Sequence, residues 1–586
     1  MGGFKVKEEV GNLEGLTRSL TFYSVGIPAY LKYEYYYRFL NSGSEEHEAE
    51  WRNLHASESK KGLDTILKLR GFYIKNGQMC ASNIGNAFPK IWQDTMSVLQ
   101  DGVPPRSYET VKEVIEDPVN GLGQKLGDVF TSFEELPIGS ASIGQVHKAV
   151  LKKTGERVVV KVQYPDVERV FRGDVRTCIM FCKVAQPVHV PALEEIEKQF
   201  MTEFDYRKEV SEQASELHPL LKLTYPIRFA RFARFARPSL KCASLRSAKA
   251  VQLETVRNNL IKSGLGGKKN GICVVPRPYS ELCSKNVLVM EELVGEKLVD
   301  GLKKDFERYA KSLGKSVAET ISDEEEKAEQ NEDCERERGP DAKTMAAYLS
   351  LLNTKRIAKN VFKACTFRWN KFEGRDTLPL NHAQLVDQLI HIHGHEVLID
   401  GYFNGDPHPG NVLLVGGKLG LIDYGQVKRI SNEDRILLAR MVIALCEDDK
   451  EEVVRLIRAV GYKTKKMNDD LHYIYAKICL DADNKTLTNG LHIQKFMEYL
   501  EGEDPIVELV SGAEWSGASH ILTQRCNDAM ITRSAQPREF VMVSRVSLML
   551  RGLGHALKQP RSIAQCWRPF AERVLREEGV LEEVKK

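Results

Sequence analysis

Residues 400–426 read DGYFNGDPHPGNVLLVGGKLGLIDYGQ, and the spacing of their acidic and amide side chains decides the fold that we expect. Asp406 precedes Asn411 by five positions, and Asp423 opens an Asp-Tyr-Gly triplet further along. Phosphoryl transfer needs a carboxylate near the acceptor, and an Asn and a second Asp that hold magnesium against the phosphates. The alternative interpretation is two ordinary turns with solvated carboxylates, because short motifs often occur by chance.

A short hairpin is predicted between these two acidic groups. The apolar runs VLLV (412–415) and LGLI (419–422) have strand character, and Gly416 and Gly417 between them are turn residues. Protein kinases show the same order, D-x-x-x-x-N followed by D-F-G with short strands between.

A glycine-rich segment far upstream supports the same interpretation. Residues 137–162 read PIGSASIGQVHKAVLKKTGERVVVKV, similar to the kinase phosphate loop G-x-G-x-x-G-x-V with one substitution. Val158–Val160 lead to Lys161 after a turn at Thr154-Gly155-Glu156, as expected for two strands that end in a phosphate-binding lysine. The loop positions are Gly139, Ala141, Gly144 and Val146.

The composition describes an ordinary globular protein that is too long for one compact core. The chain has 586 residues, of which 42% are hydrophobic and 28% charged, so we expect at least two lobes or domains. Its net charge of only +3 gives no general attraction to nucleic acid. The 12 cysteines form no C-x-x-C pair, which favours a reduced compartment over a disulfide framework.

Three further motifs, in this order, resemble those of the UbiB-type (aarF-domain) atypical kinase family. They are Lys75-Asn76-Gly77-Gln78, Glu203-Phe204-Asp205 followed by Glu209, and Pro537-Arg538-Glu539-Phe540. Together with Asp406–Asn411, the resemblance covers roughly residues 60–560 apart from two insertions. It implies an α+β, bilobal protein-kinase-like fold with an N-terminal helical extension and a mostly helical C-lobe.

The resemblance also implies a role for each matching residue. Lys75, Gly77 and Gln78 would cover the nucleotide site and meet Glu203 and Asp205, so that a peptide substrate is disfavoured. Asp406 would orient the acceptor, Asn411 and Asp423 would hold Mg²⁺, and Lys161 would hold the phosphates and pair with Glu209 or Glu203. The residues expected around ATP or ADP are Gly139, Ser140, Ala141, Ser142, Gly144, Val146, Lys161, Glu209, Met290 and Glu291.

Four regions are expected along the chain. They are an aromatic and basic arm (1–56), a helical extension (57–118), an N-lobe (119–298) with an insertion at about 218–252, and a C-lobe (299–586) with an acidic flexible linker at about 321–340. The arm fits either a membrane interface or a helix packed on the kinase body. The Arg-Phe-Ala repeat at 228–237 fits a lipid-binding helix, a disordered loop or an artefact of gene prediction.

Several other features bear on function. Residues 272–298 predict two strands that lead to the hinge between the lobes. His391, His393 and His395 alternate as in a strand, and we expect packing or surface roles rather than a metal site, because no acid or cysteine is expected nearby. Asn404 stands where kinases have the His of His-Arg-Asp. Ser431 already predicts a helix cap, which leaves no room for a peptide-displaying activation segment.

The leading hypothesis is an atypical kinase or ATPase that uses ATP (or ADP) and Mg²⁺ and supports quinone or other isoprenoid-lipid metabolism. The alternatives are a scaffold switched by nucleotide without catalysis, and a small-molecule kinase of the aminoglycoside or choline type. The expected partners are a small-molecule or lipid substrate and a membrane surface, without nucleic acid, and the oligomeric state is open. The resemblance implies a mitochondrion, with plastid or cytoplasm as alternatives, although the early acids Glu8, Glu9 and Glu14 are untypical of a transit peptide.

Overall fold

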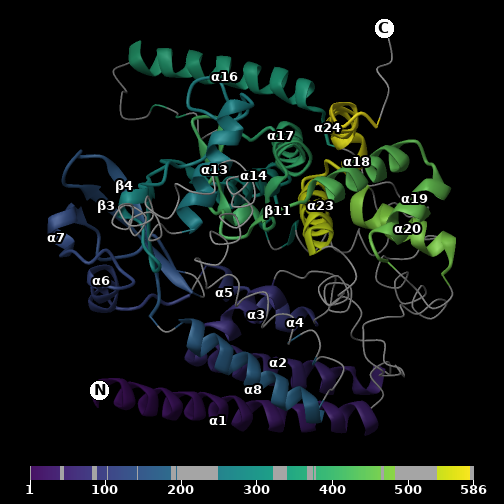
Figure 1. Cartoon of the computed structure of the whole chain (residues 1–586). Coiled ribbons are helices and arrows are strands. Elements are labelled where there is room, and N and C mark those ends of the chain that lie inside the picture. Colours follow the sequence, from purple (N-terminus) through teal and green to yellow (C-terminus); the bar gives the residue numbers. More distant parts are fainter. Residues whose placement is uncertain are drawn as a thin grey trace, which may run out of the picture. The chain divides into compact units, whose positions relative to one another are not determined.

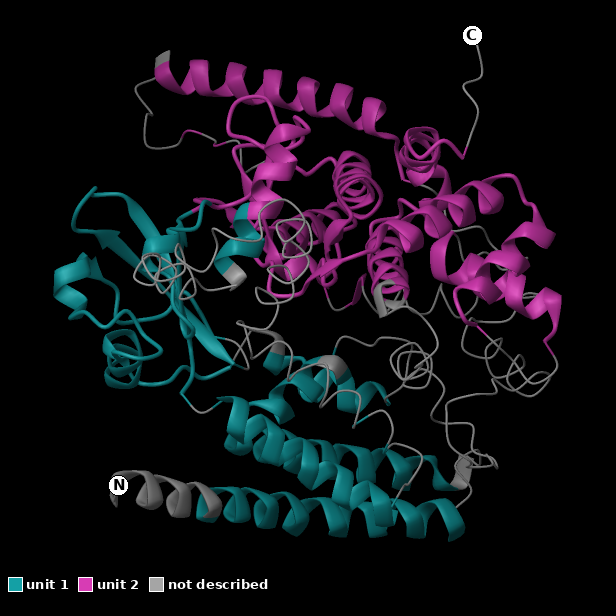
Figure 2. Cartoon of the chain, viewed as in Figure 1, with its two compact units in different colours: residues 1–254, 277–292, 512–533 teal, residues 255–276, 293–511, 534–586 magenta. Residues whose placement is uncertain are grey.

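The chain divides into two compact units, which are described separately (Figure 2). Unit 1 comprises the described residues of 2–254 and 277–292, and unit 2 those of 255–276, 293–481 and 538–580. Both units mix helices with sheets, as predicted (Figure 1). The computed structural model describes residues 2–39, 45–81, 89–101, 103–140, 143–165, 167–185, 190, 193, 248–317, 319–320, 339–365, 372, 374, 378–462, 467–481 and 538–580.

The sheet of unit 1 has the strand order β1-β3-β4-β6, with β2 paired to β3. Strands β3 and β4 form the predicted antiparallel hairpin, and Gly155 in its turn has a φ of +69°, which glycine adopts without strain. Alternate valines of β4, Val158, Val160 and Val162, are buried in the core of this sheet. The strands are β1 (Phe130–Phe133), β2 (Gly139–Ser140), β3 (Gly144–Leu151), β4 (Arg157–Gln163) and β6 (Val287–Glu291).

The helices of unit 1 include residues before the predicted helical extension of 57–118, because α1 and the first part of α2 precede it. Helix α1 packs on α2 and α8, while α3 packs on α2, α4 and α8. The aromatic arm is therefore part of a helix: Tyr30 and Tyr33 make contacts inside unit 1, whereas Tyr35, Tyr37 and Phe39 are exposed. The helices are α1 (Gly2–Phe39), α2 (Glu45–Leu69), α3 (Phe72–Ala81), α4 (Lys90–Met96), α5 (Val98–Asp101), α6 (Tyr108–Glu116), α7 (Leu126–Val129) and α8 (Val167–Ala185).

One buried ion pair fixes α1 on its neighbours. The Arg18 guanidinium donates to both carboxylate oxygens of Asp174 on α8, at 2.9 and 2.6 Å, and to the Leu69 carbonyl at the end of α2 at 2.6 Å. Burial raises the pKa of Asp174 to about 6, although Arg18 acts in the opposite direction. A single side chain thus joins three helices, and its loss leaves a buried carboxylate without a cation.

We expect Arg18→Met to loosen α1 by about 3–5 kcal/mol, because removing one partner of a buried pair leaves the other uncompensated. The folded pKa of about 6 lies above the ordinary 3.8, so ionisation of Asp174 lowers stability as the pH rises from about 4 to about 6. Arg18 lowers this pKa, so in the variant it rises above about 6, and the deficit relative to the wild type grows as the pH rises past 6. The deficit should therefore be larger at about pH 8 than at about pH 5. Amide hydrogen exchange of α1 at both pH values measures it.

Arg38→Met is the matched control, because Arg38 pairs with Glu34 on the same helix and its side chain is 70% exposed. Exchange of α1 that is equally slow in both variants would contradict the role of Arg18.

Unit 2 contains two small sheets and most of the long helices. One sheet has the order β5-β10-β9-β7, and β8 pairs with β11 in the other. The strands are β5 (Cys273–Val274), β7 (Glu296–Lys297), β8 (Tyr402–Asn404), β9 (Val412–Val415), β10 (Lys418–Leu421) and β11 (Val427–Arg429). Helix α13 (Ala248–Lys262) begins in unit 1 and continues into unit 2 at Thr255. The other helices are α14 (Leu298–Ser312), α16 (Ala342–Cys365), α17 (His382–Gly394), α18 (Asn432–Cys446), α19 (Lys450–Ala459), α20 (Asp469–Leu480), α23 (Arg538–Ala556) and α24 (Ile563–Glu577).

The two strands predicted in 272–298 belong to different sheets. Strand β6 pairs with β4 in unit 1, whereas β5 pairs in parallel with β10, with Cys273 opposite Leu419. Residues 255–276 are part of unit 2, and residues 277–292 are part of unit 1. A two-residue strand carries too little sequence signal to specify its partner strand.

Helix α24 holds the helical part of unit 2 together. Trp567 is fully buried, and its indole N–H donates to the Ile390 carbonyl of α17 at 3.0 Å. Helix α18 packs against α24 and begins where the sequence predicts, because the Ser431 hydroxyl accepts from the Asp434 amide at 3.1 Å. None of the helices in the described part of the chain is long and apolar enough to cross a membrane.

Candidate active site

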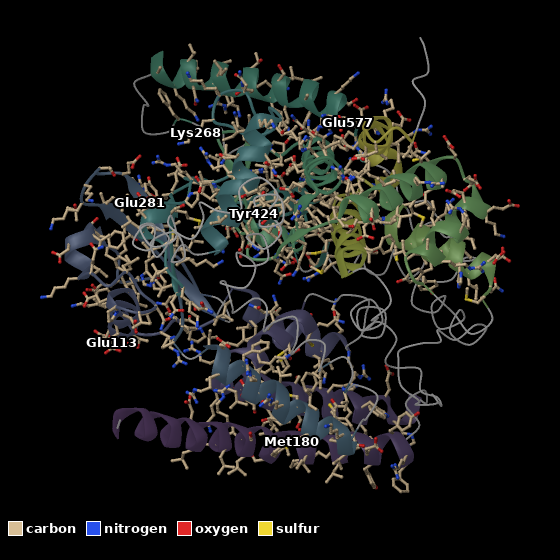
Figure 3. All side chains as sticks on the ribbon, in the orientation of Figure 1. Glu113, Met180, Lys268, Glu281, Tyr424 and Glu577 are labelled. Atoms are coloured by element: carbon tan, nitrogen blue, oxygen red, sulfur yellow. The ribbon has the colours of Figure 1, made fainter. Side chains whose placement is uncertain are left out.

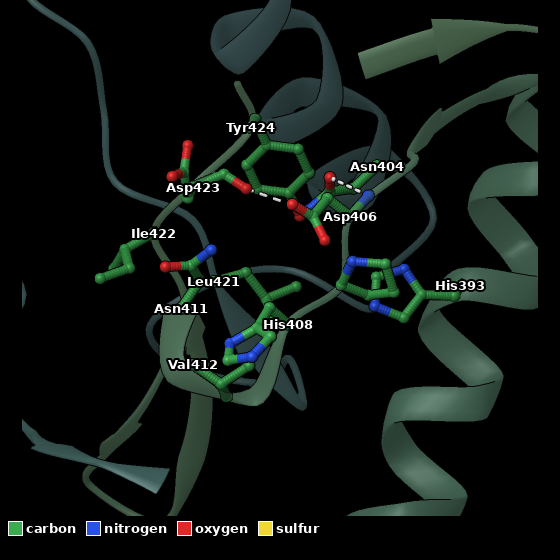
Figure 4. A pocket seen from close by; sticks show the side chains of 11 residues that line it. His393, Asn404, Asp406, His408, Asn411, Val412, Leu421, Ile422, Asp423 and Tyr424 are labelled. Carbon is green, nitrogen blue, oxygen red and sulfur yellow. Dashed lines mark hydrogen bonds between the residues drawn. The ribbon is translucent and has the colours of Figure 1, made fainter. Parts of the chain in front are cut away.

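The acidic motifs of the 400–426 segment line one pocket in unit 2 (Figure 4). Asp406 follows β8, Asn411 ends a short 3₁₀ turn (Pro409–Asn411), and Asp423 follows β10. The β9–β10 hairpin is formed as predicted, and its turn glycines Gly416 and Gly417 have φ values of +56° and +83°. Its register places the start of β9 opposite the end of β10, which brings the Asn411 and Asp423 ends of the two strands together.

The side chain of Asn404 joins the two acidic loops. Its amide Nδ2 donates to the Asp423 carbonyl at 2.9 Å, and its Oδ1 accepts from the Asp406 amide at 3.0 Å. Asn404 is only 6% exposed, and its strand β8 pairs with β11 immediately after the Asp-Tyr-Gly triplet. The residue that departs from the kinase His-Arg-Asp pattern thus fixes the backbones of both acidic residues (Figure 4).

The buried carboxylate of Glu396 is hydrogen-bonded to the loop that contains Asp423. Glu396 is fully buried; its Oε1 accepts from the Tyr424 hydroxyl at 3.1 Å, and its Oε2 lies 2.9 Å from Nδ1 of His393. Burial, and then the Glu396 charge, raise the pKa of the Tyr424 phenol well above its ordinary value, so the hydroxyl stays protonated and can donate. Tyr424 lies among the packed side chains of unit 2 (Figure 3) and anchors the triplet that begins with Asp423.

The alternate spacing of the three histidines suits a strand, but the residues form helical structure. His391 and His393 lie on α17, and His395 begins a π-helical turn (His395–Asp400) that continues it. The expectation that no acids lie nearby also fails, because Glu396 approaches His393 and Asp400 lies 3.2 Å from His395. Within the described residues, no group of three or more His, Cys, Asp or Glu could hold a metal ion.

Arg545 is a contact of the site that the sequence did not reveal. Its guanidinium donates to Oδ1 of Asp406 at 3.1 Å and to the Gln426 side chain at 3.4 Å, from helix α23. In the sequence, Arg545 is noticeable only as a cation that interrupts an apolar helix. That interruption was the available signal, because a cation on an apolar helix needs a polar partner where the helix packs.

The phosphate-loop residues lie in unit 1. Lys161 lies on β4, opposite Val146 on β3 and Leu288 on β6. Gly144 permits a close approach, since a Cβ there would lie 2.5 Å from the Val162 carbonyl oxygen. Ser140 pairs with Gln145, next to the pair of Gly139 with Val146, and its hydroxyl lies 2.8 Å from that of Tyr164. Of the other expected nucleotide contacts, Met290 and Glu291 end β6, whereas Ala141, Ser142 and Glu209 lie outside the described residues.

The Lys-x-Gly-Gln residues lie on α3 of unit 1. Gly77 is needed for packing, because a Cβ there would lie 2.3 Å from Leu99 Cδ1. The side-chain amide of Gln78 donates to the Leu99 carbonyl at 2.9 Å. Lys75 is partly exposed on the same helix. Glu203 and Asp205, its expected partners, lie outside the described residues. The structure thus brings Asp406, Asn411 and Asp423 together in one unit, and places Lys161, the phosphate loop and Lys75 in the other.

A comparison with known families agrees with this arrangement of motifs. The pattern of the ABC1 atypical kinase-like domain matches residues 98–225 and 367–457, which include the phosphate loop, Lys161 and both acidic motifs. The chain contains an ABC1 atypical kinase-like domain. The resemblance to the aarF-domain family is thereby confirmed.

Three relatives illustrate the similarity. AarF domain-containing protein kinase 1 of Gallus gallus is 23% identical over 544 residues, which cover 91% of this chain and 78% of that protein. Probable protein kinase UbiB of Pseudomonas paraeruginosa is 24% identical over 86% of this chain and 69% of its own. Protein ACTIVITY OF BC1 COMPLEX KINASE 8, chloroplastic, of Arabidopsis thaliana is 23% identical over 88% of this chain, which spans about half (53%) of that protein.

We expect Asn404→Leu to loosen both acidic loops of the ABC1 domain. Leucine has a similar size but leaves the Asp423 carbonyl and the Asp406 amide unpaired, at a cost of about 2 kcal/mol or more. Amide hydrogen exchange at residues 404–426 should accelerate accordingly.

Asn381→Leu is the matched control, because Asn381 also makes two side-chain hydrogen bonds, to the Ala342 carbonyl and the Gln384 amide. The bridging role would be excluded if the two variants exchanged equally at residues 404–426.

Proposed function

We propose that this protein is an atypical kinase or ATPase that binds ATP and Mg²⁺ and acts on a small-molecule or lipid-derived acceptor. The supporting observation is the single pocket lined by Asp406, Asn411 and Asp423, whose two loops are joined through Asn404. Oxygen ligands from one carboxylate and one amide, completed by phosphates and water, suit Mg²⁺. The residues present therefore fit the metal that the family implies.

In this proposal the chain's own groups each have one task. Asn411 and Asp423 hold the metal, which when bound neutralises the charge of the transferring phosphates. Lys161 holds the α/β-phosphates, with Gly139–Gly144 around them and Met290 and Glu291 near the adenine. Asp406 orients the acceptor hydroxyl or a water molecule, and its carboxylate is held by Arg545.

We also propose that units 1 and 2 act as the two lobes of a kinase, and that Lys75 and Gln78, with Glu203 and Asp205, disfavour peptide entry. The interval from Asp423 to the start of α18 at Asn432 contains β11, which pairs with β8. It leaves no length for a peptide-displaying activation segment. We place this activity in quinone or isoprenoid-lipid metabolism, in a mitochondrion or plastid, as the resemblance to the family implies; of the three relatives named above, one is described as chloroplastic.

We expect Asp423→Asn to abolish stabilisation by Mg-ATP. A ligand at a hundred times its Kd stabilises a fold by about 2.7 kcal/mol, and this increment should depend on Mg²⁺ in the wild type and vanish in the variant. Thermal unfolding with ATP, with and without Mg²⁺, measures it.

Asp387→Asn is the control, because Asp387 is a partly exposed carboxylate that pairs with Arg561. Full Mg-ATP stabilisation of the Asp423→Asn variant would refute the metal assignment.

Arg545→Ala should lower the release of ADP from Mg-ATP by roughly 10- to 100-fold, because a freed Asp406 carboxylate no longer holds the acceptor in a reactive orientation. Stabilisation by Mg-ATP should stay near that of the wild type. Arg561→Ala, which removes the partner of Asp387, is the control.

The nucleotide-switched scaffold would replace the enzyme if the wild type bound Mg-ATP but released no ADP, with or without membranes. Unchanged turnover in Arg545→Ala would exclude Arg545 as a positioning residue.

A further inference from the structure

Helix α16 differs from the other long helices of unit 2 in having no buried side chain. Across its described side chains, residues 342–364, every one is partly or fully exposed. It lies at the edge of unit 2 (Figures 1 and 2). A 24-residue helix of this kind must gain its stability from something other than a buried core face.

The first turn of α16 is firmly built. Asp341 accepts hydrogen bonds from the Lys343 and Thr344 amides at 2.8 and 3.0 Å, and the Asn381 amide donates to the Ala342 carbonyl at 2.9 Å. The helix therefore starts at a defined point against α17 and presents its remaining length along the surface of unit 2.

The charge of α16 has one sign. It contains Lys343, Lys355, Arg356, Lys359 and Lys363 but no acidic residue. Over the whole chain, the 84 basic and 81 acidic residues nearly balance, so such a segment is a local departure from the composition. A helix with only positive charge is complementary to an anionic surface.

Large apolar side chains accompany these cations. Leu351 and Phe362 are 53% and 69% exposed, and their spacing of eleven residues returns to the same face of a helix. Lys355 lies one turn from Leu351. Tyr348, Ile357 and Val361 are also at least 49% exposed. Tyr348 lies near the face of Leu351 and Phe362, whereas Ile357 and Val361 lie on another face, so the apolar face of α16 is formed by Tyr348, Leu351 and Phe362.

The ABC1 domain match does not include this helix. The matched segments end at residue 225 and resume at 367, and α16 ends at Cys365. The helix therefore lies outside the segments that match the family pattern.

We propose that α16 is a docking helix for an anionic lipid bilayer, with its apolar side chains in the interface and its lysines at the headgroups. The combination of exposed apolar groups with basic residues is that of helices that lie in a membrane surface. This proposal does not depend on phosphoryl transfer, since no residue of α16 belongs to the candidate active site.

Helix α1 is the competing surface, because it exposes more large apolar side chains than α16 does. Five of them recur at spacings that share one helix face, and three aromatic ones follow: Leu13, Leu16, Leu20, Ile27, Leu31, Tyr35, Tyr37 and Phe39. The charges of α1 are mixed, however, and several are paired: Arg18 with Asp174, and Lys32 with Glu58. Helix α1, which carries both acidic and basic residues, is less complementary to an anionic surface than α16, whose charged residues are all basic.

Flotation of the full-length protein with vesicles tests the proposal. The protein should bind phosphatidylcholine vesicles that contain about one-third phosphatidylserine, bind pure phosphatidylcholine much less, and dissociate as salt rises. Lys343→Glu/Lys355→Glu should reduce partitioning by roughly tenfold or more. Leu351→Gln/Phe362→Gln should reduce it similarly, because apolar insertion is lost.

The controls are matched in chemistry. Lys112→Glu/Lys153→Glu makes the same change of net charge at exposed positions of unit 1 and should bind like the wild type. Leu20→Gln/Leu31→Gln makes the same apolar change on α1 and should also bind like the wild type.

Three results would overturn the proposal. The wild type binds no anionic vesicles; the α1 variant loses binding while both α16 variants keep it; or Leu351→Gln/Phe362→Gln abolishes a dimer of the free protein without changing partitioning. Loss of binding in both α16 variants, with retention in both controls, supports it.

Discussion

The two hydrogen bonds of the Asn404 side chain are the constraint on which the candidate active site depends. They connect the backbone of Asp406 to that of Asp423, so that two loops separated by the β9–β10 hairpin move as one. Each acidic residue alone would be a surface carboxylate at the end of a strand. Joined, they are the two residues to which our proposal assigns the acceptor-orienting and metal-holding roles of phosphoryl transfer.

The interior of unit 2 supports this connection. Glu396 accepts the Tyr424 hydroxyl and approaches His393, so the loop that contains Asp423 is tied to α17 and the turn after it. A buried carboxylate is tolerated only where its oxygens are satisfied, and here both are used. Arg545 adds a second connection from α23 to Asp406. The loops that contain Asp406 and Asp423 are thus held by side chains from helices, which favours a well-defined geometry of the site.

Turns and helix starts could be predicted from the sequence, because each depends on a few neighbouring residues. Turn glycines, which adopt a positive φ, predicted the β3–β4 and β9–β10 hairpins. Ser431, as a helix cap, predicted the start of α18. Long-range contacts could not be predicted in the same way. Nothing near Arg545 in the sequence indicates Asp406, and nothing near Asn404 indicates that it accepts and donates across two loops. The alternate spacing of three histidines is typical of a strand, yet the helical pattern of the flanking apolar residues decides the structure of this segment.

We propose that residues of both units bind one Mg-nucleotide, and a structure of the full chain with Mg²⁺ and a non-hydrolysable ATP analogue is the sharpest test. We expect Asn411 and Asp423 oxygens at about 2.1 Å from the metal and the Lys161 ammonium within hydrogen-bond distance of the α/β-phosphates. A nucleotide bound elsewhere, or a metal that Asp423 does not contact, would contradict it.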